Sequence, residues 1–241
     1  MKVLWPHNFA PSHLNSQIFI NITADGLRAN GIDIQFEYLG NLRAIRNILN
    51  SRRRLKQLQK YFDLVHVQYG SASAFVVGKA INMIPKILTI RGNDWNLHST
   101  SVDFHYFHTR LARLMTYCSL NRYDCIIAVS NRLAQEIRRY TNKSKVFVLP
   151  TPIDLKKFIP YDKDEARRML GFSDFNQKWV LFNAINLNDP IKRFSLAQKA
   201  FALANKKMGN LRFCVANNVP HSLIPQFTSA CDVILCTSET E

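Results

Sequence analysis

Lys192 is the first residue whose type and position could do chemistry. It follows the apolar run 179–184 and stands where a helix is expected to begin. A lysine at a helix start places a mobile cation beside backbone N–H donors, so a phosphate there would be held by both. The ordinary alternative is a solvated lysine at the start of a surface helix.

Arg91 and Asp94 form a second polar segment, directly after the apolar run 87–90. Loops that follow parallel strands face the ligand crevice of a doubly wound domain. We therefore expect Arg91 to meet a phosphate or another substrate charge, and Asp94 to contact a substrate hydroxyl. An Arg91–Asp94 pair that only holds its own loop explains the same residues equally well.

Other kinds of chemistry have little support in the sequence. No apolar run is followed by G-x-G-x-x-G, and the chain has no G-x-x-x-x-G-K-[ST], which argues against a nicotinamide enzyme and a P-loop NTPase. The triplet Asp162-Lys163-Asp164 resembles a metal-binding D-x-D motif, but it opens a helical pattern after a linker, so we interpret it as a helix cap. The sequence predicts no cofactor and no essential metal.

The elements that must position these residues alternate between short apolar runs and longer helical patterns, as in parallel strands joined by crossover helices. Strands are expected at 3–5, 32–38, 64–68, 87–90, 126–130, 146–149, 179–182, 211–215 and 233–235. Helices are expected at 16–30, 42–61, 72–82, 104–121, 131–140, 163–170, 191–207 and 222–229.

A proline-punctuated stretch divides this pattern into two parts. Six strands with their helices complete one domain at 1–150, and 151–160 reads as a linker. The alternation restarts at 161–241 with only three strands. We therefore expect one complete domain and a partial second one, and we interpret the chain as truncated at its C-terminus.

Three separated segment pairs, in the same order, resemble those of family-four retaining glycosyltransferases. They are 63–70 with 87–94, 123–130 with 148–160, and 180–193 with 230–241. The resemblance implies an α/β fold of the GT-B type, with two Rossmann-like doubly wound parallel-sheet domains, the second incomplete. It also implies a nucleotide diphosphate sugar as the donor substrate.

The resemblance assigns roles to residues at the expected strand ends. Glu241 matches the first glutamate of the family's E-x7-E motif, Lys192 matches its phosphate lysine, and Arg193 could substitute for an arginine that has no match. The expected catalytic residues are Glu241, Arg91 and Asp94. The expected donor-binding residues are Lys192, Arg193, Asn186 and Ser130, and those on the acceptor side are Tyr69, Gly70 and Asn8. Tyr69, Arg91, Asp94 and Ser130 should lie along one cleft.

The positive charge is concentrated in the first part of a chain whose net charge is +15, and no acidic residue lies between Glu37 and Asp63. The basic residues of 42–61 are interleaved with leucine and isoleucine, as in an amphipathic helix at an anionic membrane surface. A solvated helix face is the alternative. The chain has no nucleic-acid recognition motif and no apolar run that could span a bilayer. We therefore expect a cytoplasmic protein, peripheral at the inner face of the membrane, without a nucleic-acid partner.

The combined interpretation is a hexosyltransferase that moves a sugar to a saccharide or lipid-linked acceptor with retention, in the synthesis of surface polysaccharide or glycoconjugate. Because the second glutamate of the motif would fall beyond Glu241, we expect this chain itself to transfer sugar poorly. The alternative function is a non-catalytic fragment that serves as a basic binding module.

Overall fold

The computed structural model describes residues 1–9, 18–92, 94–96, 104–172 and 176–238, with the side chains of 104–108 left out. The expected catalytic residue Glu241 lies outside the described residues. The chain divides into two compact units, Met1–Pro152 and Ile153–Glu241, and each is described by itself.

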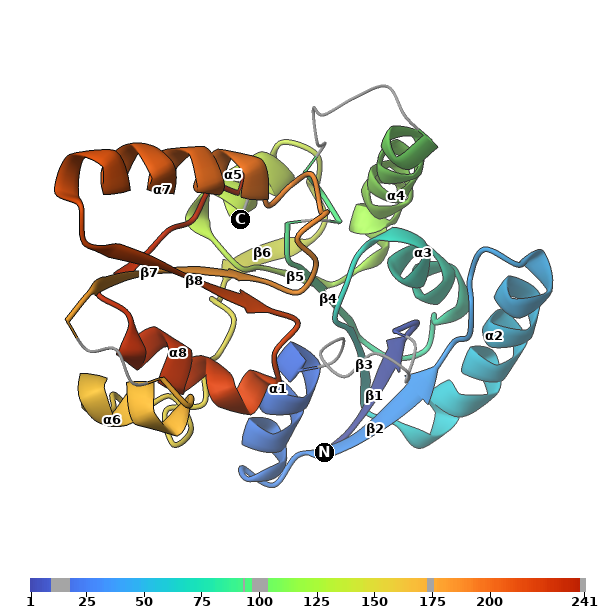
Figure 1. The fold of residues 1–241 in the computed structure, drawn as a ribbon. Helices are drawn as coiled ribbons and strands as arrows, with labels where there is room; N and C mark the ends of the chain where they lie inside the picture. Colours follow the sequence, from blue (N-terminus) through green and yellow to red (C-terminus); the bar gives the residue numbers. More distant parts are fainter. Residues whose placement is uncertain (10–17, 93, 97–103, 173–175, 239–241) are drawn as a thin grey trace. The chain divides into compact units, whose positions relative to one another are not determined.

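Six parallel strands form the sheet of the first unit, in the order β2-β1-β3-β4-β5-β6 (Figure 1). The strands are β1 Lys2–His7, β2 Asp33–Tyr38, β3 Leu64–Val67, β4 Lys86–Ile90, β5 Cys125–Ala128 and β6 Lys145–Val148. The order reverses between β1 and β3, because the chain passes outward from β1 to β2 and then returns across β1 to β3. This is the topological switch point of the unit.

Crossover helices cover both faces of this sheet (Figure 1). The helices are α1 Ile18–Arg28, α2 Ile45–Leu58, α3 Ser71–Ala80, α4 Phe104–Ser119 and α5 Asn131–Arg138, with short 3-10 turns η1 Gln59–Tyr61 and η2 Leu120–Arg122. Right-handed crossovers place α1 on one face and α2 to α5 on the other. The alternation of β1 shows this division, because Val3 and Trp5 pack with Ile20 and Ala24 of α1, whereas Leu4 packs in the core under α2 and α3.

Two aspartates fix the start of strands in this sheet. Asp63, just before β3, accepts a 2.6 Å hydrogen bond from the backbone N–H of Lys2 and donates its own N–H to the Lys2 carbonyl oxygen. Asp124, just before β5, makes the same pair of bonds with Lys86, with 2.8 Å for the carboxylate bond. Each of these strand-start aspartates therefore holds the first residue of the neighbouring strand in register.

The second unit has a parallel sheet in the order β8-β7-β9. Its elements are α6 Lys163–Met169, β7 Lys178–Ala184, α7 Phe194–Met208, β8 Leu211–Asn217, η3 His221–Leu223, α8 Ile224–Ala230 and β9 Val233–Ile234. Alternation along β7 again divides the core, since Trp179 and Leu181 pack with α6 and α8, whereas Phe182 and Ala184 pack with α7.

Asp232 is the strand-start aspartate of this unit, and it carries an ion-pair network as well. Its carboxylate accepts the Trp179 N–H at 2.8 Å and pairs with Lys163 at 2.5 Å, Lys178 at 3.7 Å and Arg167 at 3.2 Å. The Arg167 side chain is only 2% exposed. The carboxylate therefore neutralises a buried guanidinium while it sets the start of β9.

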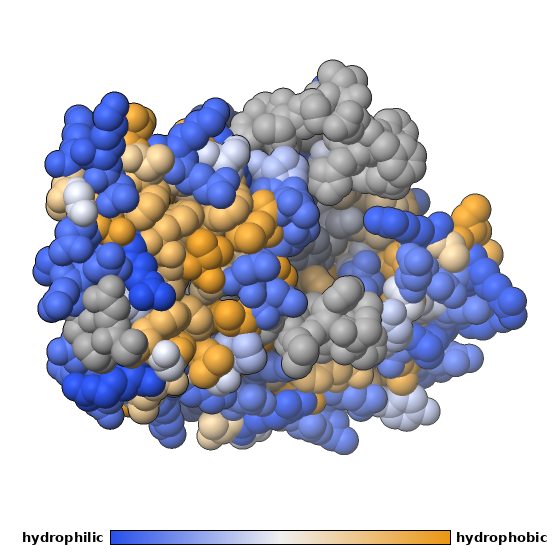
Figure 2. Space-filling model, viewed as in Figure 1, coloured by the Kyte–Doolittle hydropathy of each residue, from blue (hydrophilic) through white to orange (hydrophobic). Residues whose placement is uncertain are grey.

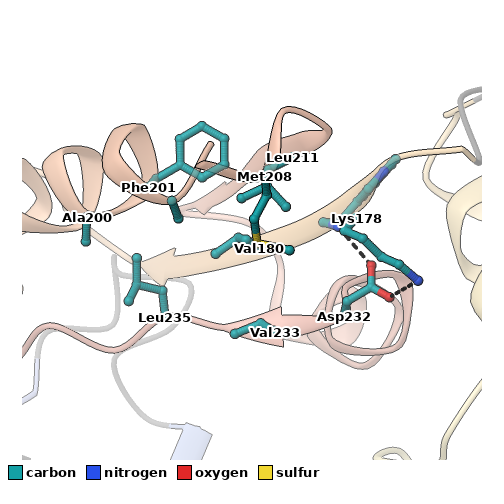
Figure 3. A pocket seen from close by; sticks show the side chains of 11 residues that line it. Lys178, Val180, Ala200, Phe201, Met208, Leu211, Asp232, Val233 and Leu235 are labelled. Atoms are coloured by element: carbon teal, nitrogen blue, oxygen red, sulfur yellow. Dashed lines mark hydrogen bonds and ion pairs between the residues drawn. The ribbon is translucent and has the colours of Figure 1, made fainter. Parts of the chain in front are cut away.

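An apolar hollow of about 530 Å³ lies between α7 and the strands β7 and β9 (Figure 3). Val180, Phe201 and Leu235 line it, and Lys178 and Asp232 stand at one end. Apolar residues also gather on the surface of the unit between α7 and α8 (Figure 2). Helix α7 therefore leaves part of the apolar surface of the second unit uncovered.

The expected α/β fold of the GT-B type is confirmed, and the differences lie at element ends. The strand expected at 126–130 stops at Ala128, because Ser130 is the N-cap of α5 and accepts the Leu133 N–H. The helix expected at 191–207 begins at Phe194, because Arg193 has left-handed backbone angles. Asp162 caps α6 as expected. Among the described residues, no helix has the length and apolar character needed to cross a membrane.

Candidate functional site

The β1–β3 switch point opens the candidate site of the first unit. Pairing between β1 and β2 continues to His7, whereas pairing between β1 and β3 stops at Leu4. Pro6 lies in the part of β1 that pairs with β2 but not with β3, and because it has no N–H to donate, it suits a strand that separates from one neighbour there. A ligand crevice is expected outside the carboxyl ends of strands at this point.

Asp94 joins the two loops that follow β3 and β4. One carboxylate oxygen accepts the backbone N–H of Arg91 at 3.0 Å and of Gly92 at 2.9 Å, and the other accepts the Gly70 N–H at 2.6 Å. The residue is 1% exposed, and burial raises the pKa of its carboxyl although these N–H bonds oppose the rise. With both oxygens bonded to the backbone, Asp94 is placed to hold the loops in shape. The loop is thus held by bonds from Asp94 to backbone N–H groups and not by an Arg91–Asp94 pair, and the contact of Asp94 with a substrate hydroxyl stays a prediction.

Thr116 of α4 completes the same junction. Its hydroxyl donates to the Asp94 carbonyl oxygen at 3.0 Å and accepts the Ser71 N–H at 2.6 Å. A Cβ added at Gly70 would lie 2.6 Å from the Thr116 hydroxyl oxygen, so only glycine fits. Ser71 has a φ of 63°, which is unusual for a residue other than glycine. The start of α3 is thus held in a tight, locally strained approach to α4.

The Arg91 guanidinium lies at the carboxyl end of the sheet among four partners. Nη2 donates to the side-chain oxygen of Gln68 at 2.7 Å, Nε donates to the Gln68 carbonyl at 3.2 Å, and Nη1 donates to the Thr151 hydroxyl at 2.9 Å. The group also stacks over the ring of Phe19, 4.1 Å from its centroid. No side-chain ion pair joins Arg91 to Asp94 within the described residues, so Arg91 keeps a charge that a bound anion could meet.

Arg91 is oriented by a series of buried hydrogen bonds through Gln68 and His66 to Thr89. His66 Nε2 lies 2.8 Å from the Thr89 hydroxyl oxygen and 3.1 Å from the amide nitrogen of Gln68. Burial and, to a smaller extent, the charge of Arg91 lower the pKa of His66 to about 3. Burial also lowers the pKa of Arg91 to about 10, against the attraction of Asp94. His66 is therefore neutral at physiological pH, and the positive charge resides on Arg91.

The remaining expected residues of the first unit follow the ends of their strands. Tyr69 packs edge-on against Phe9, and burial raises the pKa of its phenol. Asn8 accepts a hydrogen bond from the Ser73 hydroxyl at 2.9 Å, which joins the loop after β1 to α3. The hydroxyl of Ser130 is occupied by the α5 cap. Tyr69, Arg91, Asp94 and Ser130 thus all follow the carboxyl ends of β3, β4 and β5 at one edge of the sheet.

The second unit has its own switch point, between β7 and β9. The connection from β7 to α7 is shaped by its side chains, since the Asn186 side-chain oxygen accepts the Asn188 N–H at 2.9 Å and that of Asp189 accepts the Ile191 N–H at 3.0 Å. After β9, the Thr237 hydroxyl donates to the carbonyl oxygens of Lys192 at 2.8 Å and Arg193 at 3.2 Å. The loops at the two strand ends therefore meet at Lys192.

Helix α7 starts two residues after Lys192. Arg193 is its N-cap, with no side-chain hydrogen bond to the helix. Backbone N–H groups at such an end attract anions, and the 15-residue length of α7 supports a full helix dipole. Lys192, Arg193 and Asn186 thus lie in one connection before a helix N-terminus.

Several residues of these sites were missed in the sequence. Gln68 and Thr116 hold Arg91 and the Asp94 junction, and His7 is buried at the end of β1. The signal available for Gln68 was its place directly after a buried strand that itself contains the polar residue His66. Thr116 gave no signal, because its contacts depend on the packing of α4. No group of three or more histidine, cysteine, aspartate or glutamate residues suited to a metal occurs in the described ranges.

Comparison with known proteins identifies one family. The sequence profile of Glycosyltransferase Family 4 matches residues 15–157, which is more than half of the chain. Among curated proteins, no sequence matches the chain.

Solved structures share the fold over almost the whole chain. Sucrose-phosphate synthase from Thermosynechococcus elongatus superposes with a TM-score of 0.72 at 13% identity, covering 99% of this chain and 75% of that one. Anabaena HepE in complex with UDP and glucose gives 0.58 at 15% identity, covering 99% and 74%. UDP-GlcNAc 2-epimerase from Neisseria meningitidis bound to UDP-GlcNAc gives 0.55 at 17% identity, covering 99% and 73%. At these identities the likeness shows the fold alone.

Proposed function

We propose, because this chain belongs to Glycosyltransferase Family 4, that it binds a nucleoside diphosphate sugar and transfers the sugar to an acceptor hydroxyl. The connection between β7 and α7 carries the donor assignment. It brings Lys192 to the uncapped N-terminus of a 15-residue helix, where a phosphate group is attracted by the lysine charge and by backbone N–H groups.

The donor proposal extends to uridine nucleotides. HepE is described with UDP and glucose and the Neisseria epimerase with UDP-GlcNAc, and both superpose on nearly all of this chain. Sugar transfer requires that the negative charge of the departing diphosphate be stabilised. We assign that role to Lys192, with Arg193 in the same connection. Arg91 is proposed to meet substrate charge from the first unit, where Gln68 and Phe19 orient it.

Positioning is the second requirement of the reaction, since a transfer without a covalent protein intermediate depends on the alignment of the two reactants. The Asp94 junction fixes the loops that carry Tyr69, Gly70 and Arg91, and we propose that these loops form the acceptor side with Asn8. Ser130 is proposed as a further donor contact. Glu241 keeps its proposed role beside the transferred sugar, which its family motif suggests.

The finer proposals follow from the family resemblance. We propose that transfer proceeds with retention, that no cofactor or essential metal takes part, and that the acceptor is a saccharide or lipid-linked sugar used in surface polysaccharide or glycoconjugate synthesis. Epimerases share this fold, so the reaction type needs its own test. An epimerase would convert a UDP-sugar without an acceptor, whereas a transferase releases UDP in proportion to glycosylated product.

The first prediction tests the donor site by calorimetric titration of the whole chain with UDP. Lys192→Ala should weaken UDP binding by about tenfold or more, the factor expected when a hydrogen bond to a charged group is lost. Lys199→Ala is the matched control, because Lys199 is an exposed lysine within the same helix. Equal affinity of the two variants, or no UDP binding by the unmodified chain, contradicts the donor assignment.

Activity is then measured as UDP release from a panel of UDP-sugars with saccharide and lipid-extract acceptors. NMR of the product reads the anomeric configuration, and inversion would reject the proposed retention. Acceptor-independent conversion of the sugar would reject transfer and favour the epimerase reaction.

Helix α2 supports a second part of the proposal, contact with an anionic membrane surface. Ile45 is 74% exposed and Leu49 is 58% exposed, one helical turn apart, and Arg46 and Arg53 are exposed beside them. Arg54 differs, because its guanidinium pairs with Glu37 and so does not add an unpaired charge to this face. Within the described residues, Arg46 and Arg53 form no ion pair, and an outward face that combines apolar side chains with such arginines suits insertion among anionic headgroups.

The second prediction is that the chain sediments with anionic vesicles and not with neutral ones. Each basic residue near the surface contributes about 1 kcal/mol, so Arg46→Gln with Arg53→Gln should reduce the bound fraction strongly, and added salt should do the same. Leu49→Ala should also weaken vesicle binding, and because its contribution is apolar, this loss should persist at high salt. Equal sedimentation with neutral vesicles would remove this part of the proposal and leave the donor assignment intact.

A further inference from the structure

A second hollow, of about 890 Å³, lies in the first unit at the edge of the sheet opposite to the candidate site. Its walls include Lys86 and Lys145, which are the first residues of β4 and β6. The site residues described above follow the last residues of the strands instead. The hollow is therefore separated from the candidate site by the length of the sheet.

Five basic side chains from five different elements line this hollow. They are Lys79 of α3, Lys86 of β4, Arg122 of η2, Lys143 of the connection between α5 and β6, and Lys145 of β6. A run of basic sequence cannot explain such a group, because its members are up to 66 positions apart. The fold itself assembles them.

The acidic residue in the walls does little to neutralise this charge. Asp124 is the strand-start aspartate of β5, and its carboxylate already accepts the backbone N–H of Lys86 at 2.8 Å. It forms no ion pair within the described residues. Lys86 binds the Ile81 carbonyl oxygen at the end of α3, and Lys79 lies over the ring of Phe75. The C-terminal end of α3 thus stabilises the charge of Lys86, and an aromatic ring stabilises the charge of Lys79.

The side chains of the other three basic residues, Arg122, Lys143 and Lys145, make no hydrogen bond or ion pair in the described part of the chain. Two asparagines add neutral donors to the same walls. The Asn82 side-chain oxygen accepts from Gln59 at 3.3 Å and the Asn121 oxygen accepts from the Thr141 hydroxyl at 2.7 Å. Their NH2 groups therefore remain as donors, and five cations and two amide donors face one carboxylate, Asp124, among the side chains of the hollow.

Gly78 shows that Arg122 is held in place by packing. A Cβ at this position in α3 would lie 3.3 Å from both Cβ and Cδ of Arg122 and 3.3 Å from a ring carbon of Tyr123. Glycine in a helix interior is about 1 kcal/mol less favourable than alanine. Here it lets the Arg122 stem lie against α3, next to a Tyr123 that is 2% exposed. The aliphatic part of the Arg122 side chain is thus packed against α3.

We propose that this hollow is a second anion site, which binds a species that carries two or more phosphate groups. Phosphate oxygens accept several hydrogen bonds and match both the arginine fork and the amide donors. The phosphates could belong to a free polyphosphorylated molecule or to the headgroups of an anionic lipid. The hollow shares no residue with the proposed donor site, because Lys192 and Arg193 belong to the second unit and every wall residue belongs to the first.

Tripolyphosphate is the probe for the free ligand, titrated into the whole chain at about 0.1 M salt with saturating UDP present. The variant Arg122→Gln with Lys145→Gln should bind it at least about tenfold more weakly, as expected for the loss of one charged hydrogen bond. Lys206→Gln with Lys207→Gln removes the same charge from the end of α7 and should leave the affinity unchanged. Circular dichroism melting curves check that both variants are folded.

A second arm uses vesicles with and without a lipid that carries phosphorylated headgroups. Loss of vesicle binding in the Arg122 and Lys145 variant alone, without tripolyphosphate binding, supports the site and identifies lipid as the phosphate source. Hydrogen exchange should show ligand protection in peptides that contain Arg122 and Lys143. The proposal is overturned if neither probe binds, if UDP abolishes tripolyphosphate binding, or if both charge variants lose affinity equally.

Discussion

Gly70→Ala tests whether the Asp94 junction has the close packing that the structure shows. The new Cβ would lie 2.6 Å from the hydroxyl oxygen and 2.9 Å from the methyl group of Thr116, and 3.0 Å from an Asp94 carboxylate oxygen. Overpacking of this kind costs about 1 to 3 kcal/mol. The shift that relieves it weakens the bonds from the Gly70 and Ser71 N–H groups, adding about 1 kcal/mol or more. We expect a total loss of about 2 to 4 kcal/mol.

The assay is urea unfolding with hydrogen exchange read on peptides of β3, α3 and β4, and peptides of the second unit serve as the internal reference. Gly26→Ala is the matched control, because an added Cβ in α1 meets no atom within 4 Å and should stabilise the helix by up to about 1 kcal/mol. Thr116→Ala removes two of the three close atoms, so Gly70→Ala should cost less in that background. Additive losses, or a Gly70→Ala variant as stable as the unmodified chain, would refute the packing argument.

Two further predictions concern charge inside the fold. Asp232→Asn should destabilise the second unit by about 3 kcal/mol, because the buried Arg167 loses its anion. Asp124→Asn only replaces a charged acceptor of one N–H by a neutral one and should cost about 1 kcal/mol or less. Burial alone would raise the pKa of Asp232, but the bonds from Lys163 and the Trp179 N–H outweigh it and lower the pKa. The stability that Asp232 contributes is therefore present above the ordinary aspartate pKa and is lost as the pH falls through the lowered value. Hydrogen exchange of β7 peptides against pH measures this loss, and equal effects of the two variants would contradict the ion-pair network. His66 has a pKa lowered to about 3, so it opposes folding between its unfolded pKa of about 6.5 and that value, by up to about 1.4 kcal/mol per pH unit. His66→Gln should therefore lose less stability than the unmodified chain on acidification from about pH 6.5 to 4.5, and an unchanged slope would show that His66 is not the titrating group.

The sequence was informative where a local pattern determines the structure. Alternation of apolar residues predicted the strands, and the side chains of Ser130 and Asp162 cap the helices that follow them, as expected from their positions. Helix ends were less accurate where backbone geometry decided them, as at Arg193 with its left-handed angles.

The sequence predicted which residues of the candidate site follow strand ends, but it did not predict the contacts between them. Arg91 and Asp94 were expected together, but the partner of the Asp94 carboxylate across the junction is the Gly70 N–H, 24 positions away. That bond exists because β3 and β4 are neighbours and α4 brings Thr116 beneath the loop. No local propensity encodes such a contact, so the sequence suggested a loop-holding Asp94 but not its bond to the neighbouring loop.

The strand-start aspartates have a consequence for how the two sheets find their alignment during folding. Parallel neighbours are distant in the chain, and the clamped pairs are separated by 61, 38 and 53 positions. No tight turn can set their alignment, and a slip by one residue would turn every side chain to the wrong face. A carboxylate that recognises one particular N–H penalises such a slip at the moment of docking. An aspartate placed just before a strand can thus specify which parallel strands pair and at which residue each begins, and a designer could use it for that purpose.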